Sequence, residues 1–65
     1  MAKTVYDVLI AKYAEDVLSA TQFLANGGAK DFAEYREVVG RIRGLQLAMQ
    51  TTQDLLRSQD EDDDN

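Results

Sequence analysis

The side chains that could do chemistry in this chain are hydroxyls and carboxylates, because the sequence contains neither His nor Cys. A Ser or Thr nucleophile needs an adjacent base, and without His the commonest base for that role is missing. The hydroxyls fall in segments of helical pattern with no activating partner: Ser19, Thr21, Thr51, Thr52 and Ser58. We therefore expect no catalytic residue and no enzymatic activity.

Paired carboxylates are a second source of chemistry, since two acidic groups held together can act as general acid and general base. Glu15 and Asp16 are adjacent, so on a helix they point in different directions. Glu34 and Glu37 share a face with Arg41, which favours exposed ion pairs over an active site. We interpret both pairs as solvated surface.

The C-terminal residues Asp60, Asp62 and Asp64 repeat the spacing that opens an EF-hand calcium loop. The Gly that turns such a loop and the bidentate Glu that closes it are both missing. Without Cys or His, thiolate and imidazole metal sites are also excluded. The sequence therefore predicts no metal site, no cofactor and no small-molecule substrate.

Nucleic-acid and membrane binding are disfavoured by charge, since seven Lys and Arg against twelve Asp and Glu give a net charge of −5. Arg36 and Arg43 share a helix face, but a small basic cluster is more consistent with ion pairing than with phosphate contacts. The polar faces mix both signs, and the acidic C-terminus would be repelled by anionic lipid. With no signal-peptide pattern, we expect a soluble intracellular protein.

The excess negative charge lies in one short run, so residues 1–59 carry seven charges of each sign. The run is Asp60, Glu61, Asp62, Asp63 and Asp64. Asp is a poor helix former and is unfavourable at the negative end of a helix dipole. We therefore predict two parts, a helical hairpin over 1–59 and a disordered acidic tail over 60–65 that keeps it soluble.

Two stretches of helical periodicity are separated by Gly27 and Gly28. The first covers about 5–25, and Thr4 with Asp7 forms a capping-box pattern at its start. Its apolar residues recur at alternating spacings of four and three, as in a heptad repeat. They are Tyr6, Ile10, Tyr13, Val17, Ala20 and Leu24.

The second helix is expected over about 32–58, with Asp31 as its N-cap and Glu34 as the reciprocal partner. Its apolar stripe also alternates spacings of three and four: Tyr35, Val38, Ile42, Leu45, Met49, Thr52 and Leu56. A short loop between two helices favours an antiparallel pair. The sequence therefore predicts an all-α fold, a two-helix antiparallel hairpin whose two stripes form the seam between the helices.

The second helix carries another set of small and apolar residues on roughly the opposite side from its stripe. They are Gly40, Gly44, Leu47, Ala48, Thr51 and Leu55. Gly inside a helix costs about 1 kcal/mol relative to Ala. Gly40 and Gly44 are simply tolerated, relieve crowding beside Arg41 and Arg43, or admit a second helix at close range. We expect this face to be a partner interface.

A two-helix unit rarely offsets its chain entropy unaided. Leu9, Leu18 and Phe23 add apolar surface that a lone hairpin leaves exposed. We therefore expect association into a helical bundle, most simply a dimer of four helices. Docking on a larger protein assembly, or a place in an obligate hetero-complex, would use the same face.

Three segments resemble small acidic helical-hairpin proteins of tailed bacteriophages: Val5–Leu9, Gly28–Arg36 and Val39–Leu45. The resemblance covers most of the chain and brings no catalytic signature with it. It implies a viral context, with the protein in the host cytoplasm or associated with the virion. The first hypothesis is therefore a non-enzymatic interaction protein of phage particle morphogenesis, at the head, portal or connector.

The alternative hypothesis is a phage-encoded acidic inhibitor of a host enzyme, including one that binds nucleic acid. In that role residues 60–64 would act as phosphate surrogates in a basic channel. The zero charge balance of residues 1–59 argues against it, because a duplex mimic would spread carboxylates along a whole face. Removal of the residues after Ser58 separates the two hypotheses, since only inhibition should lose affinity.

Overall fold

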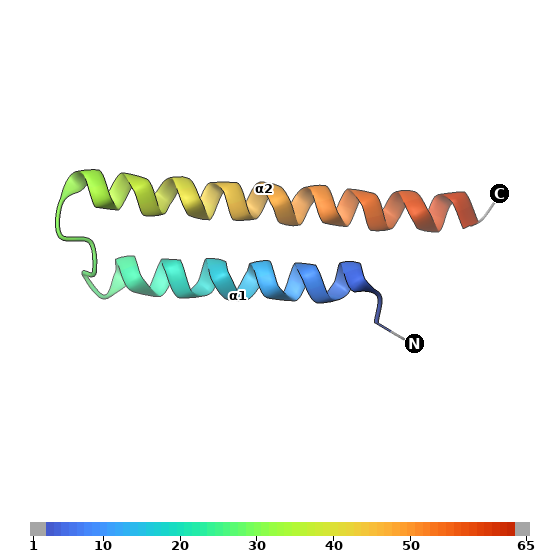
Figure 1. Ribbon diagram of the computed structural model, residues 1–65, viewed down its shortest axis with the longest axis horizontal. Coiled ribbons are helices and arrows are strands. Elements are labelled where there is room, and N and C mark those ends of the chain that lie inside the picture. Colours follow the sequence, from blue (N-terminus) through green and yellow to red (C-terminus); the bar gives the residue numbers. More distant parts are fainter. Residues whose placement is uncertain (1–2, 64–65) are drawn as a thin grey trace.

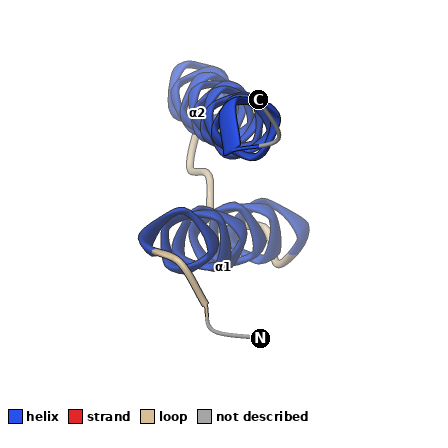
Figure 2. Cartoon of the chain, turned by 90° about the vertical axis from the view of Figure 1, so that its right-hand side faces the viewer, coloured by secondary structure: helices blue, strands red, loops and turns tan. Residues whose placement is uncertain are grey.

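The computed structural model describes the backbone of residues 3–63 and the side chains of residues 3–59. Within them lie two helices, α1 (Val5–Ala25) and α2 (Phe32–Asp63), and no strand. The helices run antiparallel side by side (Figure 1). Seen along their length, they form one layer joined by the loop (Figure 2). The predicted all-α antiparallel hairpin is confirmed.

α1 begins at a capping box made by Thr4 and Asp7. The Asp7 backbone N–H donates to the Thr4 hydroxyl at 3.2 Å, and the Thr4 backbone N–H donates to the Asp7 carboxylate at 3.0 Å. The Thr4 backbone hydrogen bond, followed by that of the Thr4 hydroxyl, lowers the pKa of Asp7 below its usual 3.8. Two backbone donors of the first turn are thereby satisfied.

α1 ends in a Schellman motif at the two loop glycines. The Gly27 N–H donates to the Leu24 carbonyl at 3.0 Å, and the Gly28 N–H donates to the Phe23 carbonyl at 2.8 Å. Gly27 has a φ of +75°, which is the left-handed region. A Cβ on Gly28 would lie 2.5 Å from two carbon atoms of the Phe23 ring. Both positions therefore favour Gly for reasons internal to the hairpin.

α2 begins with a cap close to the predicted one. The Asp31 carboxylate accepts the Glu34 backbone N–H at 2.8 Å, as expected of an N-cap. The Glu34 carboxylate in turn accepts the backbone N–H of Lys30, at 2.8 Å, rather than that of Asp31. The reciprocal pairing thus reaches one residue further into the loop than predicted.

α2 ends at Asp63, beyond the predicted end near Ser58. The segment from Arg57 to Asp63 contains no Gly or Pro, and each Asp costs only a fraction of a kcal/mol in a helix. That cost does not stop the extension of a helix already nucleated. The backbone of residues 60–63 therefore departs from the disordered tail predicted for 60–65, and residues 64 and 65 lie outside the described part of the chain.

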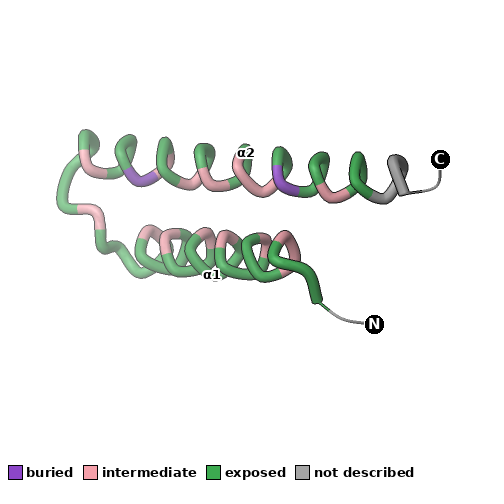
Figure 3. The backbone as a smooth tube through the Cα atoms, turned by 45° about the vertical axis from the view of Figure 1, so that its right-hand side comes forward, coloured by how far each residue is buried: buried purple, intermediate pink, exposed green. Residues whose placement is uncertain are grey.

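The core of the hairpin is thin. Among the side chains of residues 3–59, only Val38, at 5% exposure, and Thr52, at 7%, are buried. Both lie on the side of α2 that faces α1 (Figure 3). The chain exposes 5259 Å² of surface, whereas a compact monomer of its 7.3 kDa would expose about 4,200 Å². Much apolar surface therefore stays uncovered.

Candidate interaction surface

The stripe residues predicted for the seam between α1 and α2 are buried or half-buried, with one exception. α1 contributes half-buried Tyr6, Ile10, Tyr13, Val17, Ala20 and Leu24. α2 contributes buried Val38 and Thr52 together with half-buried Ile42, Leu45, Met49 and Leu56. The Thr52 hydroxyl donates to the Ala48 carbonyl at 2.8 Å, so its burial leaves no polar atom unsatisfied.

The exception is Tyr35, which was predicted to lie in the seam and is 46% exposed. Its ring stacks on that of Phe32, with the centroids 6.1 Å apart and the planes at 19°. The Arg36 guanidinium carbon lies 6.0 Å from the centroid of the same Phe32 ring. A heptad pattern records spacing along one helix only, and here the ring finds its neighbour on its own helix. The α2 part of the seam therefore begins at Val38.

The outer face of α2 consists of Gly40, Gly44, Leu47, Ala48, Thr51 and Leu55. Leu47 is 65% exposed and Leu55 is 53% exposed, while Ala48 is half-buried at the edge towards the seam. A Cβ on Gly40 or Gly44 would meet no atom within 4 Å. The packing of the hairpin therefore does not account for either glycine.

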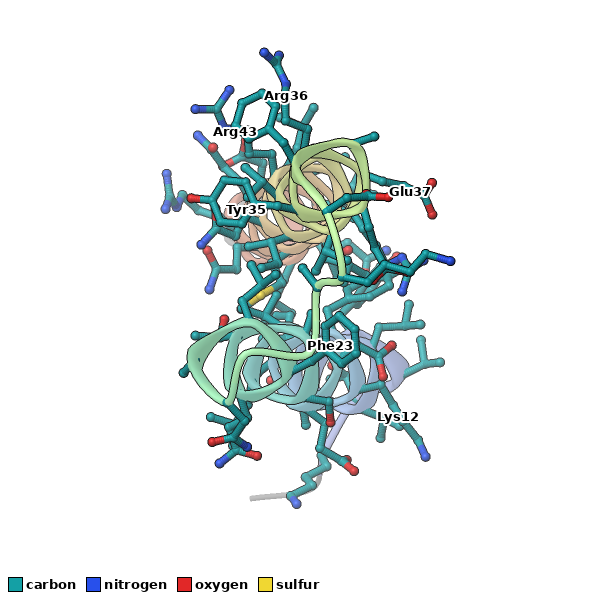
Figure 4. All side chains as sticks on the ribbon, turned by 90° about the vertical axis from the view of Figure 1, so that its left-hand side faces the viewer. Lys12, Phe23, Tyr35, Arg36, Glu37 and Arg43 are labelled. Carbon is teal, nitrogen blue, oxygen red and sulfur yellow. The ribbon has the colours of Figure 1, made fainter. Side chains whose placement is uncertain are left out.

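Charged side chains flank the outer face. Arg41 and Glu37 form an ion pair at 3.8 Å, which is exposed and contributes at most about 1 kcal/mol. It is the only ion pair among the described side chains, so Arg43 and Asp54 have no such partner there. Figure 4 shows Arg36 and Arg43 extending from the side of α2 that faces away from α1. These side chains are available to a partner.

A shallow groove lies on α2 beside the outer face. Its lining consists of Phe32, Tyr35, Arg36, Val39, Gly40 and Arg43. Aromatic residues and Arg are enriched at the centres of protein interfaces. A second groove, between the helices, mixes apolar residues with both signs of charge, including Phe23, Glu37 and Arg41. The groove that contains Phe32, Tyr35 and Arg36 therefore has the composition typical of a protein–protein contact.

Among the side chains of residues 3–59, no group of three or more acidic, His or Cys residues is placed to hold a metal ion. The Thr52 hydroxyl is engaged with a backbone carbonyl. In the same part of the chain, neither helix has a stretch long and apolar enough to cross a bilayer.

Comparison with known proteins found no family model, no curated protein and no solved structure that matches the chain.

Two features of the structure were missed by sequence reasoning. The stack of Phe32, Tyr35 and Arg36 could have been found from its spacing of three and four residues. The contact of Gly28 with Phe23 has no signal in the sequence, because it depends on how the loop folds back.

Proposed function

We propose that this protein is a non-enzymatic helical interaction protein that self-associates or docks on a larger protein assembly. The observation that carries the proposal is the thin core, in which Val38 is the one buried hydrophobic side chain described. The large apolar side chains that stay exposed are Val5, Val8, Leu9, Leu18, Phe23, Phe32, Tyr35, Leu47 and Leu55. Apolar surface on this scale is typical of proteins that bind other proteins.

The energetic reason is the small size of the chain. A domain of about 60 residues buries only about 60% of its unfolded surface and is marginally stable. The sequence has no Cys for a disulfide, so association is the remaining common way to stabilise such a fold. Full burial of one Leu or Phe contributes about 1.5–3 kcal/mol, so a few such contacts match the stability of an ordinary domain.

The resemblance to small acidic helical hairpins of tailed bacteriophages supports a phage particle as the larger assembly. The head, portal or connector would then be the site of docking, and the protein would occupy the host cytoplasm before incorporation. Purified particles should contain the chain in a fixed ratio to a structural protein. Its absence from particles purified after expression in infected cells would restrict the proposal to self-association.

The direct test is the dependence of stability on protein concentration, from about 1 to 100 μM. If folding is coupled to association, the melting temperature rises with concentration by mass action. Circular dichroism follows the helices, and sedimentation equilibrium gives the mass. A chain that melts cooperatively as a monomer, at a temperature independent of concentration, would contradict the thin-core argument.

A further inference from the structure

We propose that the outer face of α2 binds a second copy of the chain, with the two α2 helices antiparallel about a twofold axis between Leu47 and Ala48. The inference rests on the proposed function, because it names the partner and the geometry for the same surface. Its first support is the order of residue sizes along that face.

In an antiparallel pair of identical helices, residues equally far from the axis on its two sides lie at the same height. Gly40 of one copy then lies level with Leu55 of the other. The same operation places Gly44 level with Thr51, and Leu47 level with Ala48. Each pair joins a smaller residue to a larger one, so the two helices can keep a constant separation along the contact.

A parallel arrangement gives the opposite result. Gly40 would face Gly40 and Leu55 would face Leu55, which leaves a gap at one end and crowding at the other. Packing against an unrelated helix would not require that positions equally far from the axis join a smaller residue to a larger one. The size order therefore favours a second copy of this chain in the antiparallel orientation.

Gly44 and Thr51 lie near the centre of the outer face, where two packed helices come closest. Interaxial distances run from about 8 to 10 Å, and a missing Cβ allows the low end of that range. The surroundings of Gly40 and Gly44 are open in the hairpin. The contact would cover Leu47 and Leu55, which are 65% and 53% exposed. The contact would therefore explain both why the two leucines are exposed in the hairpin and why α2 contains the two glycines.

Charge complementarity is the second, independent support. Arg43 and Asp54 lie on the same flank of the outer face and on opposite sides of the proposed axis. Antiparallel packing brings Arg43 of one copy to within about 3 Å, along the helix axis, of Asp54 of the other. Within one chain they are separated by about 16 Å along α2 and cannot pair. The twofold axis creates this contact twice.

A charge swap tests the geometry in the full chain. Arg43→Asp and Asp54→Arg should each raise the dimer Kd roughly tenfold, because each disturbs two contacts. The double variant should return to within about twofold of the wild type, since the pair is restored with reversed signs. Arg57→Asp, on α2 but off the outer face, is the matched control and should change little. A double variant as weak as the single ones would overturn the proposal.

Cysteine cross-linking tests the axis itself, since the chain has no native Cys. Ala48→Cys lies beside its own symmetry mate, within the Cα separation of about 4.4–6.8 Å that a disulfide needs. It should oxidise to a covalent dimer. Thr51→Cys should not, because its mate lies about 10 Å away along the helix axis. Equal cross-linking of both variants would indicate a parallel pair and overturn the proposal.

The mass of the wild-type protein distinguishes a failure of the inferred dimer geometry from a failure of the proposed function. If the wild type sediments as a dimer and Ala48→Cys does not cross-link, the inferred geometry is wrong while the proposed function stands. If the wild type stays monomeric over the whole concentration range, both this inference and self-association are contradicted. Dimerisation with cross-linking at position 48 alone is the expected result.

Discussion

The two pairs of glycines in this chain have different explanations. Gly27 and Gly28 close the loop, one with a φ of +75° and the other against the Phe23 ring. Gly40 and Gly44 lie inside α2 with open space where a Cβ would be. The hairpin itself needs the first pair. The second pair makes the hairpin less stable on its own, and we propose that contact with a second copy of the chain explains it.

The largest effect is expected at the loop. Gly28→Ala should destabilise the protein by about 2–3 kcal/mol, because the new Cβ collides with the Phe23 ring and its carbonyl oxygen. Thermal unfolding followed by circular dichroism measures the loss. Gly27→Asn is the control and should cost much less, since Asn tolerates the left-handed region. If Gly28→Ala loses no more stability than Gly27→Asn, the loop must repack around the new side chain, which would contradict the prediction.

Substitution of Gly44, on the outer face, should have the opposite effect on the stability of the hairpin. In a lone hairpin, Gly44→Ala should gain about 1 kcal/mol from helix propensity, because the methyl group meets nothing. In the associated protein the methyl group enters the helix contact and should weaken dimerisation. The account therefore predicts a lower melting temperature in the wild-type background and a higher one in the Arg43→Asp background at low concentration. A gain of equal size in both backgrounds would show that Gly44 faces solvent.

A smaller effect is expected from pH at the start of α1, another feature explained within the hairpin. The pKa of Asp7 is lowered in the folded protein by hydrogen bonds from Thr4. Its contribution to stability is therefore present above its usual pKa of 3.8 and is lost as the pH falls through the lower folded value. Asp7→Asn should destabilise the protein at pH 7, and the difference from the wild type should vanish in acid. A difference from the wild type that does not decrease as the pH is lowered would contradict this role of the carboxylate.

The smallest effect is expected from the acidic end. Removal of the residues after Ser58 should change the dimer Kd by less than about twofold, because the outer face ends at Leu55. Titration by sedimentation at two salt concentrations measures it. A truncated chain that dimerises normally but loses salt-dependent affinity for a host enzyme would favour the inhibitor hypothesis instead.

The fold could be predicted because its signals are local. Thr4 and Asp7 cap α1 within one turn, Gly27 supplies the left-handed residue that ends it, and Asp31 caps α2. The spacing of the two apolar stripes then leaves an antiparallel hairpin as the simplest way to bury them. Each step needs information from only a few neighbouring residues.

The features that the sequence did not predict depend on competing interactions within the chain or on a binding partner. Tyr35 follows the heptad spacing, but its ring stacks on Phe32 instead of packing in the seam. The end of α2 depends on whether the summed helix-propensity costs of several residues exceed the free energy gained by extending an existing helix. In the structure α2 continues to Asp63. The outer face was identifiable from Gly40 and Gly44, but the spacing alone does not say what covers it.

The central claim is that the outer face of α2 is a surface for association. Sedimentation equilibrium of the wild type and of Gly44→Leu, at equal concentration and with helicity checked by circular dichroism, tests it most directly. The account predicts a wild-type mass approaching twice the 7.3 kDa of the chain and a variant mass close to that of the monomer. The same mass and the same stability for both proteins would contradict it.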